Sequence, residues 1–209
     1  MKTLNQKQVW SNIAKEWYEF KVNSPAEHVL EFLTEKKGNI LDLGSGAGRH
    51  LIKLKKGKMH LVDFSEKMIR FAKKRAKEKK IIAEFSVSDI TKLPFENNFF
   101  DSAIAIAIFH CLPKKFHKKA AKELFRVLKP GAEAEIAVWN KDSKKFRNYS
   151  KKERYVAWRD KGSRYYYLFD EKEIHKLFKD AGFRIKKAFP PERNIIFVVK
   201  KPKKQKKKS

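Results

Sequence analysis

The chain has 209 residues, of which 42% are apolar, enough for one domain with a substantial core. Cys111 is the single cysteine, which excludes internal disulfides and Cys-rich metal sites and favours a reducing, cytoplasmic compartment. No apolar run reaches the roughly 20 residues of a membrane-spanning helix. The first residues also lack the apolar stretch of a signal peptide. We therefore expect a single domain over residues 1–199, with no membrane partner and no metal.

Lys and Arg number 51 against 24 Asp and Glu, which gives a net charge of +27. Residues 200–209 read as a Lys-rich, solvated tail, but +20 remains without them, so the folded part is itself basic. A field of this size favours a polyanionic partner. The alternatives are a lysine-rich genome or a hot habitat and, with less support, an anionic membrane surface.

Two helices are predicted first in the chain, within residues 1–37. Apolar residues recur at helical spacing over 6–20. A second helix is predicted to run to about Lys36, with Ser24 as N-cap and Pro25 at its first position. Strands and helices then alternate, which predicts a parallel α/β sheet with helices on both faces. The predicted strands are 39–43, 58–62, 81–87, 101–108, 133–139, 183–189 and 193–199, the helices are 47–55, 65–79, 115–128 and 170–181, and 140–164 is a basic, aromatic insertion.

Residues 39–49 carry the strongest functional signal. A short apolar strand leads into glycines at 44, 46 and 48, which permit a tight turn and close approach to a ligand. Asp63 ends the next strand, where a carboxylate can hold both ribose hydroxyls of a nucleoside cofactor. Asp89 follows the third strand, where a carboxylate can accept from an adenine amino group. Arg49 and His50 stand where a triphosphate-binding loop needs Lys-Ser or Lys-Thr, so a triphosphate is disfavoured.

Asp42 precedes the glycines, and a carboxylate there suits a cationic ligand better than a pyrophosphate. The pattern resembles the class I S-adenosylmethionine-dependent methyltransferases, whose first motif reads hhDhGxGxG. The resemblance covers 40–48, 61–65, 88–95, 100–112 and 124–131. It implies a Rossmann-like seven-stranded sheet of order 3-2-1-4-5-7-6 with an antiparallel last strand, and S-adenosylmethionine as cofactor. The implied cofactor-binding residues are Asp42, Gly44, Ser45, Gly46, Gly48, Arg49, Asp63, Phe64, Ser65, Ser88, Asp89, Ile90 and Ile106.

The segment after the fourth strand narrows the methyl acceptor. It lacks the Asn/Asp-Pro-Pro-Tyr/Phe turn of the amino-methylating nucleic-acid enzymes. Cys111 follows His110 rather than Pro or Thr, which favours a small buried thiol over a cytosine-C5 nucleophile. Acceptors that need little activation remain, namely a carboxylate, a hydroxyl or a small molecule.

A closer resemblance is to the wobble-uridine tRNA carboxyl-methyltransferases, including the methyltransferase domain of the animal AlkB-type tRNA-modifying enzyme. Residues 100–110 are similar to that family's FDAAISIAVIHH, 137–139 to its Tyr-Val-Trp strand end, and 163–169 to its Arg-Tyr-Tyr-His block. Cys111 replaces the second His and Tyr167 the usual His. The resemblance implies methyl-ester formation on 5-carboxymethyluridine at the anticodon wobble position.

The same resemblance suggests four residues around the acceptor. Arg164 would clamp the carboxylate and His110 would donate to the carboxylate or the uracil. Trp139 would stack on the uracil, and Tyr165 would hydrogen-bond the base or ribose. Purely structural roles stay open for His110 and Trp139.

Two partners are expected. Aromatic side chains among the cations of the insertion suit an unstacked tRNA anticodon stem-loop. The resemblance also implies a small zinc-binding activator subunit that pairs with the edge strand 81–87, with homodimerisation or cover by the chain's own helices as alternatives. A small-molecule methyltransferase and an inactive RNA-binding scaffold are the competing functions. The cations are Lys144, Lys145, Arg147, Lys151, Lys152, Arg154 and Arg159, interleaved with Phe146, Tyr149, Tyr155 and Trp158.

Overall fold

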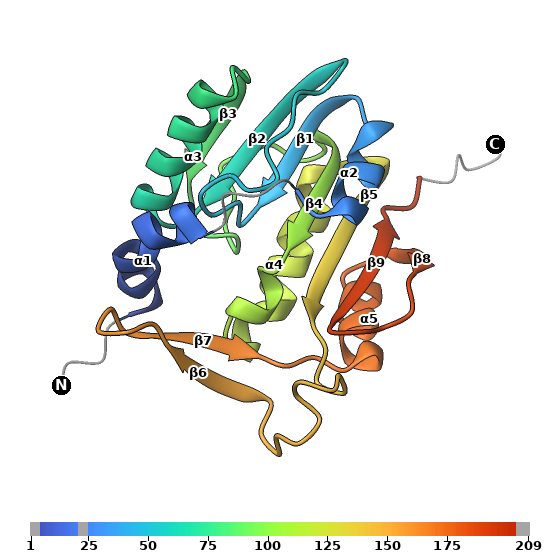
Figure 1. Cartoon of the computed structure of the whole chain (residues 1–209). Coiled ribbons are helices and arrows are strands. Elements are labelled where there is room, and N and C mark those ends of the chain that lie inside the picture. Colours follow the sequence, from blue (N-terminus) through green and yellow to red (C-terminus); the bar gives the residue numbers. More distant parts are fainter. Residues whose placement is uncertain (1–4, 21–24, 204–209) are drawn as a thin grey trace.

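A seven-stranded mixed sheet of order β3-β2-β1-β4-β5-β9-β8 forms the centre of the computed structural model (Figure 1). The structure describes residues 5–20 and 25–203. β1 to β5 pair in parallel, whereas β9 runs antiparallel to both β5 and β8. The fold class expected from the sequence is confirmed, including its antiparallel last strand. The strands are β1 Gly38–Leu43, β2 Gly57–Asp63, β3 Ala83–Val87, β4 Phe100–Ile106, β5 Leu128–Trp139, β8 Arg184–Ala188 and β9 Asn194–Lys200.

The central strands are buried on both faces, which explains their unbroken apolar runs. Helices cover these faces, and their caps follow from the sequence. The Ser65 hydroxyl accepts from the Met68 N–H at the start of α3, and Asp170 accepts from Glu173 at the start of α5. In the described residues no helix is long and apolar enough to cross a membrane. The helices are α1 Gln6–Phe20, α2 Glu27–Thr34, α3 Glu66–Glu78, η1 Phe109–Cys111, α4 Lys114–Val127 and α5 Glu171–Asp180.

Two helix predictions need correction. The predicted helix over 47–55 is a series of turns followed by extended chain. Gly46 and Gly48 have φ angles of +52° and +74°, which a right-handed helix cannot contain, and Gly48 packs against Ala72 of α3. α2 begins at Glu27 with Ala26 as N-cap, so Pro25 precedes the helix, and Ser24 lies outside the described residues.

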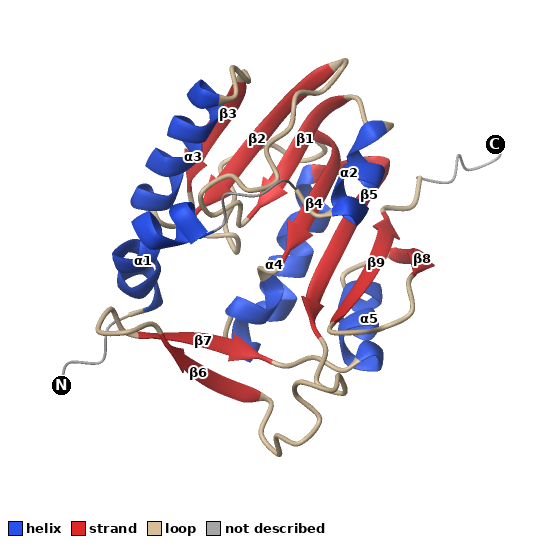
Figure 2. Cartoon of the chain, viewed as in Figure 1, coloured by secondary structure: helices blue, strands red, loops and turns tan. Residues whose placement is uncertain are grey.

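The basic insertion contains a β-hairpin that the sequence analysis did not anticipate. It consists of β6 Glu153–Ala157 and β7 Ser163–Tyr167, paired antiparallel. Figure 2 shows this hairpin beside the carboxyl ends of β4 and β5, reaching from α1 toward α5. The Gln6 side chain joins α1 to the hairpin, because its Nε2 donates to Ser163 O at 3.1 Å and its Oε1 accepts from the Tyr165 N–H at 2.8 Å.

The start of the expected tail belongs to the fold. Lys200 ends β9, and Lys201 is only 8% exposed. The Lys201 ammonium donates to the carbonyls of Phe125 and Leu128 at 2.7 Å each, and to Asn98 Oδ1 at 2.8 Å. A cation at the carboxyl end of α4 is favourable because the last carbonyls of a helix lack partners within it. Lys200 and Lys201 therefore belong to the folded part of the chain rather than to a tail.

Candidate active site

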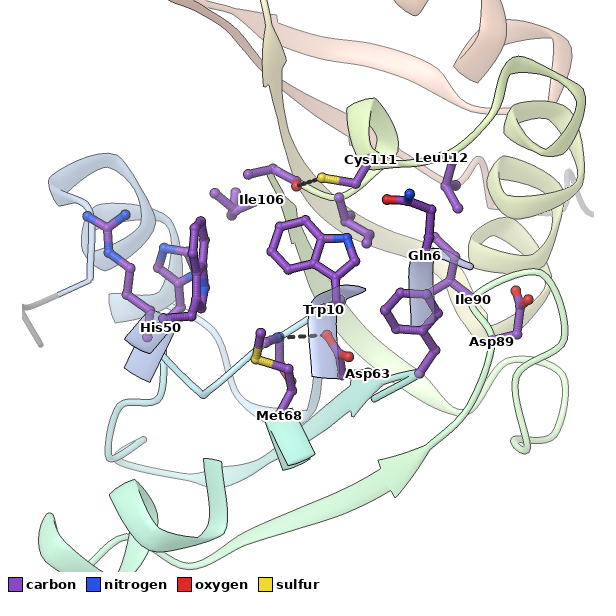
Figure 3. A pocket seen from close by; sticks show the side chains of 18 of the residues that line it. Gln6, Trp10, His50, Asp63, Met68, Asp89, Ile90, Ile106, Cys111 and Leu112 are labelled. Carbon is purple, nitrogen blue, oxygen red and sulfur yellow. Dashed lines mark hydrogen bonds between the residues drawn. The ribbon is translucent and has the colours of Figure 1, made fainter. Parts of the chain in front are cut away.

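A cavity of about 380 Å³ opens at the carboxyl ends of β1, β2 and β4. The order of the sheet reverses between β1 and β4, which is where open α/β sheets bind ligands. The glycine loop after β1 forms one wall, and α1 contributes another with Gln6, Trp10 and Trp17. In Figure 3, Trp10 projects between Ile106 and Cys111 on one side and Met68 on the other.

The glycine loop is held close to the ligand space by backbone contacts. The N–H groups of Gly44 and Ser45 donate to Val62 O at 2.8 and 2.9 Å, which ties the loop to the end of β2. Gly44 has a φ of +72°, and a Cβ there would lie 2.4 Å from the Ile108 side chain. Glycine is therefore required at this position both by conformation and by space.

Asp63 fixes the second half of the loop. Its Oδ2 accepts from the Gly46 N–H at 3.0 Å, and its Oδ1 accepts from the Ser65 N–H at 2.8 Å. Burial raises the pKa of Asp63 to about 6, although these two N–H groups act in the opposite direction. The side chain is thus mainly ionised at neutral pH, and each oxygen has further accepting capacity for ribose hydroxyls.

Asp42 lies beneath the loop and is 1% exposed. Burial, and secondarily the charge of Asp63, raise the pKa of Asp42 to about 8. Its Oδ2 has no hydrogen-bond partner among the described residues. A buried carboxylate without full pairing is costly, and a cation bound nearby would reduce that cost. The site therefore suits a nucleoside that carries positive charge.

Most of the expected cofactor residues line the cavity, but four do not. Asp42 is buried near the end of β1, Gly48 packs against α3, and Ser65 caps α3 and shares a 2.8 Å hydrogen bond with Ser11. The Ser88 hydroxyl donates to Lys92 O at 2.9 Å. The expected residues that do line the cavity are Gly44, Ser45, Gly46, Arg49, Asp63, Phe64, Asp89, Ile90 and Ile106.

Several lining residues were missed. Trp10 and Trp17 lie seven positions apart on one face of α1, with ring centroids 5.3 Å apart, and this spacing indicated only a packing face. In η1 only His110 was assigned to the site, and the start of α4 was not assigned to it, because apolar side chains there carry no chemical signal. The remaining missed residues are Gln6, His50, Met68, Cys111, Leu112, Pro113 and Phe116, whereas Ala107 and Ile108 belong to the segment 104–110 that was expected at the ligand-binding edge.

His110 and Trp139 form a stacked pair beside the cavity, and neither lines it. Their ring centroids are 4.8 Å apart, and the backbone N–H of Trp139 donates to His110 Nδ1 at 3.0 Å. Because Nδ1 accepts, the neutral ring carries its proton on Nε2. Burial lowers the pKa of His110 to about 3, so the ring is neutral at physiological pH. Tyr166 extends the stack, 4.3 Å from Trp139.

Arg164 is 7% exposed and surrounded by aromatic rings. Its guanidinium lies 4.6 Å from the Trp158 ring and 5.3 Å from Tyr166, and it lies within 6 Å of Trp10 and Trp17. No carboxylate in the described part of the chain lies within ion-pairing distance of Arg164, and its Nε has no acceptor there. A buried cation with no anionic partner is a strong sign of an anionic ligand.

Tyr165 does not join this group. Side chains alternate along β7, so Arg164 and Tyr166 share one face while Tyr165 and Tyr167 share the other. Tyr165 packs in the main hydrophobic core, with its ring 5.5 Å from Tyr155. The structure thus brings together His110, Trp139 and Arg164 of the four expected acceptor residues.

The known proteins that are similar to this chain share a methyltransferase domain but differ in their methyl acceptors. A family model described as a methyltransferase domain matches residues 34–182. The human probable tRNA methyltransferase 9B is 33% identical over 135 residues, 62% of this chain and 28% of that protein. A tRNA (carboxymethyluridine(34)-5-O)-methyltransferase of Arabidopsis thaliana is 36% identical over 101 residues, 48% of this chain and 24% of that protein.

Two other similar proteins do not point to a tRNA acceptor in the same way. One is named for quinone biosynthesis, and the other is similar in fold at low sequence identity. The ubiquinone/menaquinone biosynthesis C-methyltransferase UbiE of Chromobacterium violaceum is 28% identical over 182 residues, 80% of this chain and 72% of that protein. The complex between the Haloferax volcanii Trm112 methyltransferase activator and the putative methyltransferase gives a TM-score of 0.71 at 19% identity, covering 96% of this chain and 98% of that one.

The chain spans only about a quarter of the two tRNA-methyltransferase relatives, so their names alone do not assign its acceptor. The family match covers the whole glycine loop, Asp63 and Asp89, the residues best suited to a cationic nucleoside. The chain therefore belongs to the methyltransferase domain family and is a class I S-adenosylmethionine-dependent methyltransferase.

Proposed function

We propose that the chain methylates a carboxylate on tRNA, forming the methyl ester of 5-carboxymethyluridine at the anticodon wobble position. The observation that carries this proposal is Arg164 beside the cofactor cavity, a buried cation with no anionic partner among residues 5–20 and 25–203. A substrate carboxylate would supply the missing partner through a two-pronged hydrogen bond. The family resemblance of 163–169 and the two tRNA-methyltransferase relatives support the same substrate.

The chemistry needs alignment rather than a strong base. When bound, S-adenosylmethionine supplies an electrophilic methyl group on a positively charged sulfur. A carboxylate is already ionised at neutral pH, so no residue has to remove a proton from it. His110, neutral and protonated on Nε2, would act as a hydrogen-bond donor rather than as a general base. Arg164 would fix one carboxylate oxygen in line with the methyl group, and such positioning alone supplies much of a rate enhancement.

The insertion would hold the unstacked bases. Tyr149 and Tyr155 are 44% and 66% exposed, and the Arg154 guanidinium lies 3.3 Å from the centre of the Tyr149 ring. Exposed rings beside cations suit base stacking. Lys152, expected as an RNA contact, is instead paired with Asp170 and Glu173 at 2.7 Å each. We therefore place the stacking role on the two tyrosines.

We further propose that the zinc-binding activator subunit pairs with β3. This strand is the edge of the sheet, and it begins at Ala83 rather than at residue 81 as expected. Ile82 just before it is 83% exposed, and Val87 at its end is 44% exposed. An exposed strand edge with apolar side chains favours strand addition by a partner. The putative methyltransferase of similar fold that was solved with the Trm112 activator supports an activator as the kind of partner.

The test is transfer of labelled methyl from S-adenosylmethionine to bulk tRNA, with and without the activator subunit, followed by nucleoside analysis. A base-labile methyl ester on a wobble uridine is the expected product. Arg164→Ala should then reduce kcat/KM by at least about 100-fold with unchanged cofactor affinity, while Arg184→Ala, on an exposed arginine of β8 outside the insertion, should have little effect. Cofactor binding without tRNA labelling in either condition would overturn the proposal.

A small-molecule acceptor is the second candidate. The UbiE relative matches 80% of this chain, more than either tRNA-methyltransferase relative does. The cavity is also lined largely by apolar side chains, which suits a hydrophobic acceptor. Methylation of a quinone precursor, with no tRNA labelling, would favour this candidate.

A further inference from the structure

A shallow hollow lies along α4, outside the cofactor cavity and outside the basic insertion. Four lysines of one helix face line it, at positions i, i+3, i+4 and i+7, which places them on consecutive turns. The full set of lining residues is Thr91, Lys115, Lys118, Lys119, Lys122, Glu123 and Arg126.

The hollow has a net positive charge, because its lining has four lysines and Arg126 but a single carboxylate, that of Glu123. Glu123 is held by Arg126, with a 2.7 Å contact to Nη2, and this arginine keeps the pKa of Glu123 below its usual range. Over residues 5–20 and 25–203, no carboxylate forms an ion pair with the four lysines. Elsewhere on the surface, by contrast, Glu133 binds Lys36 and Lys186, at 2.9 and 2.6 Å.

The arrangement also works against the stability of α4. Lys115 and Lys119, Lys118 and Lys122, and Lys122 and Arg126 are like-charged pairs at i,i+4, and each such pair destabilises a helix. They outnumber the one opposite-charged i,i+4 pair in the lining, Lys119 and Glu123. An anion lying in the hollow would relieve this repulsion. The loss of helix stability that this repulsion causes in the free protein therefore indicates a surface adapted to a bound polyanion.

The hollow adjoins the mouth of the cofactor cavity. Ile90 lines the cavity and Thr91 lines the hollow, and in the same way Phe116 lines the cavity and Lys115 the hollow. Phe116 is 39% exposed where the two meet. A chain lying in the hollow could thus deliver one unit into the cavity mouth.

We propose that this hollow on α4 binds the phosphate backbone of the RNA next to the nucleotide that is methylated. The inference rests on the proposed tRNA substrate and adds the surface that holds its backbone. From Lys115 to Lys122 the helix advances about 10 Å. One nucleic-acid strand carries a phosphate about every 3.4 Å of axis, so this length matches about three phosphates. The hollow on α4 binds phosphates, and Tyr149 and Tyr155 of the insertion stack on bases. The RNA therefore contacts two separate surfaces of the protein.

The test compares two triple variants of equal charge. Lys118→Ala, Lys119→Ala and Lys122→Ala remove the hollow's cations. Lys37→Ala, Lys55→Ala and Lys56→Ala remove three exposed cations at the amino ends of β1 and β2, at the opposite end of those strands from the cavity. Binding of bulk tRNA is measured from about 0.05 to 0.2 M salt. For the hollow variant, the fall of log affinity with log salt should be less steep by about 2, because each lost phosphate contact reduces the slope by roughly 0.7 to 0.9.

Two further measurements separate the possible outcomes. The hollow variant should keep its cofactor affinity and unfold at a slightly higher temperature in low salt, since like-charge repulsion is removed. Equal slopes for both triple variants would overturn the inference even if the native protein methylates tRNA. A slope lowered only in the hollow variant, without tRNA methylation, would support the inference and overturn the proposed reaction. No tRNA binding by the native protein would overturn both.

Discussion

Asp42→Asn should stabilise the cofactor-free protein at alkaline pH and weaken its binding of the cofactor. The native carboxyl is 1% exposed, its Oδ2 has no hydrogen-bond partner in the described part of the chain, and its pKa is raised from about 3.8 to about 8. The folded state therefore keeps a proton that the unfolded chain has already released. Unfolding becomes easier as the pH rises from about 4 to about 8, because the unfolded state binds fewer protons there. Asparagine has the same shape and does not titrate, so the variant loses this slope.

The size of the effect follows from the shift. Each pKa unit corresponds to about 1.4 kcal/mol, so a raised pKa of about 8 costs roughly 4 kcal/mol of stability between about pH 5 and pH 8. Relaxation around a buried charge lowers this figure, and we expect a gain of about 2 to 4 kcal/mol for the variant over that interval. Near pH 4 the two proteins should be almost equally stable.

Chemical denaturation at about pH 5, 6.5 and 8 measures the difference, with Glu96→Gln as an exposed carboxylate control. Calorimetric titration of S-adenosylmethionine at about pH 8, where the native carboxyl is about half ionised, should show affinity reduced about tenfold or more in Asp42→Asn, because asparagine cannot acquire the negative charge. Stability profiles that run parallel across the pH range in the native protein and the variant would refute the assignment of a raised pKa to Asp42.

Three further outcomes are expected. Cofactor affinity should fall up to about tenfold per pH unit below about pH 6, where Asp63 becomes protonated and loses its accepting charge, and Asp63→Asn should flatten that profile in calorimetric titrations. Gly44→Ala should cost about 1 to 3 kcal/mol in denaturation, and adding Ile108→Ala should recover little of it, since the Cβ of residue 108 would still lie 2.7 Å from the added methyl group and the positive φ remains. Lys201→Met should lower the unfolding free energy by about 2 to 4 kcal/mol by leaving buried carbonyls unpaired, whereas the exposed Lys203→Met should not.

The sheet and its ligand edge could be predicted because their signals are local. The strand that ends at Leu43 and the glycines after it fix a turn at one place in the sequence, whatever the rest of the chain does. The end of β2 at Asp63 is marked in the same way. The full strand order, by contrast, came from resemblance to a family, since periodicity alone cannot order parallel strands.

The errors arose where a tertiary contact overrode a local pattern. Leu51, Ile52 and Leu54 have a spacing that is compatible with a helix, but the contact of Gly48 with α3 holds the chain in a turn. The hairpin of β6 and β7 has alternating side chains and a Gly162 turn, yet its basic composition favoured a loop. Because neighbouring side chains of a strand point to opposite faces, a strand prediction for 163–167 would have separated Arg164 from Tyr165.

The sequence could not identify the residues that connect the cofactor cavity with the acceptor site around Arg164. Trp10 and Trp17 line the cofactor cavity, and their rings also lie within 6 Å of the Arg164 guanidinium. Glu16 on the same helix accepts from Trp158 Nε1 and pairs with Lys161 at 2.6 Å, which fastens α1 to the hairpin. Since α1 forms a wall of both sites, the position of Arg164 depends on how α1 packs over the cofactor cavity. A glycine motif specifies cofactor chemistry by itself, whereas the acceptor site exists only after α1 and the hairpin have packed together.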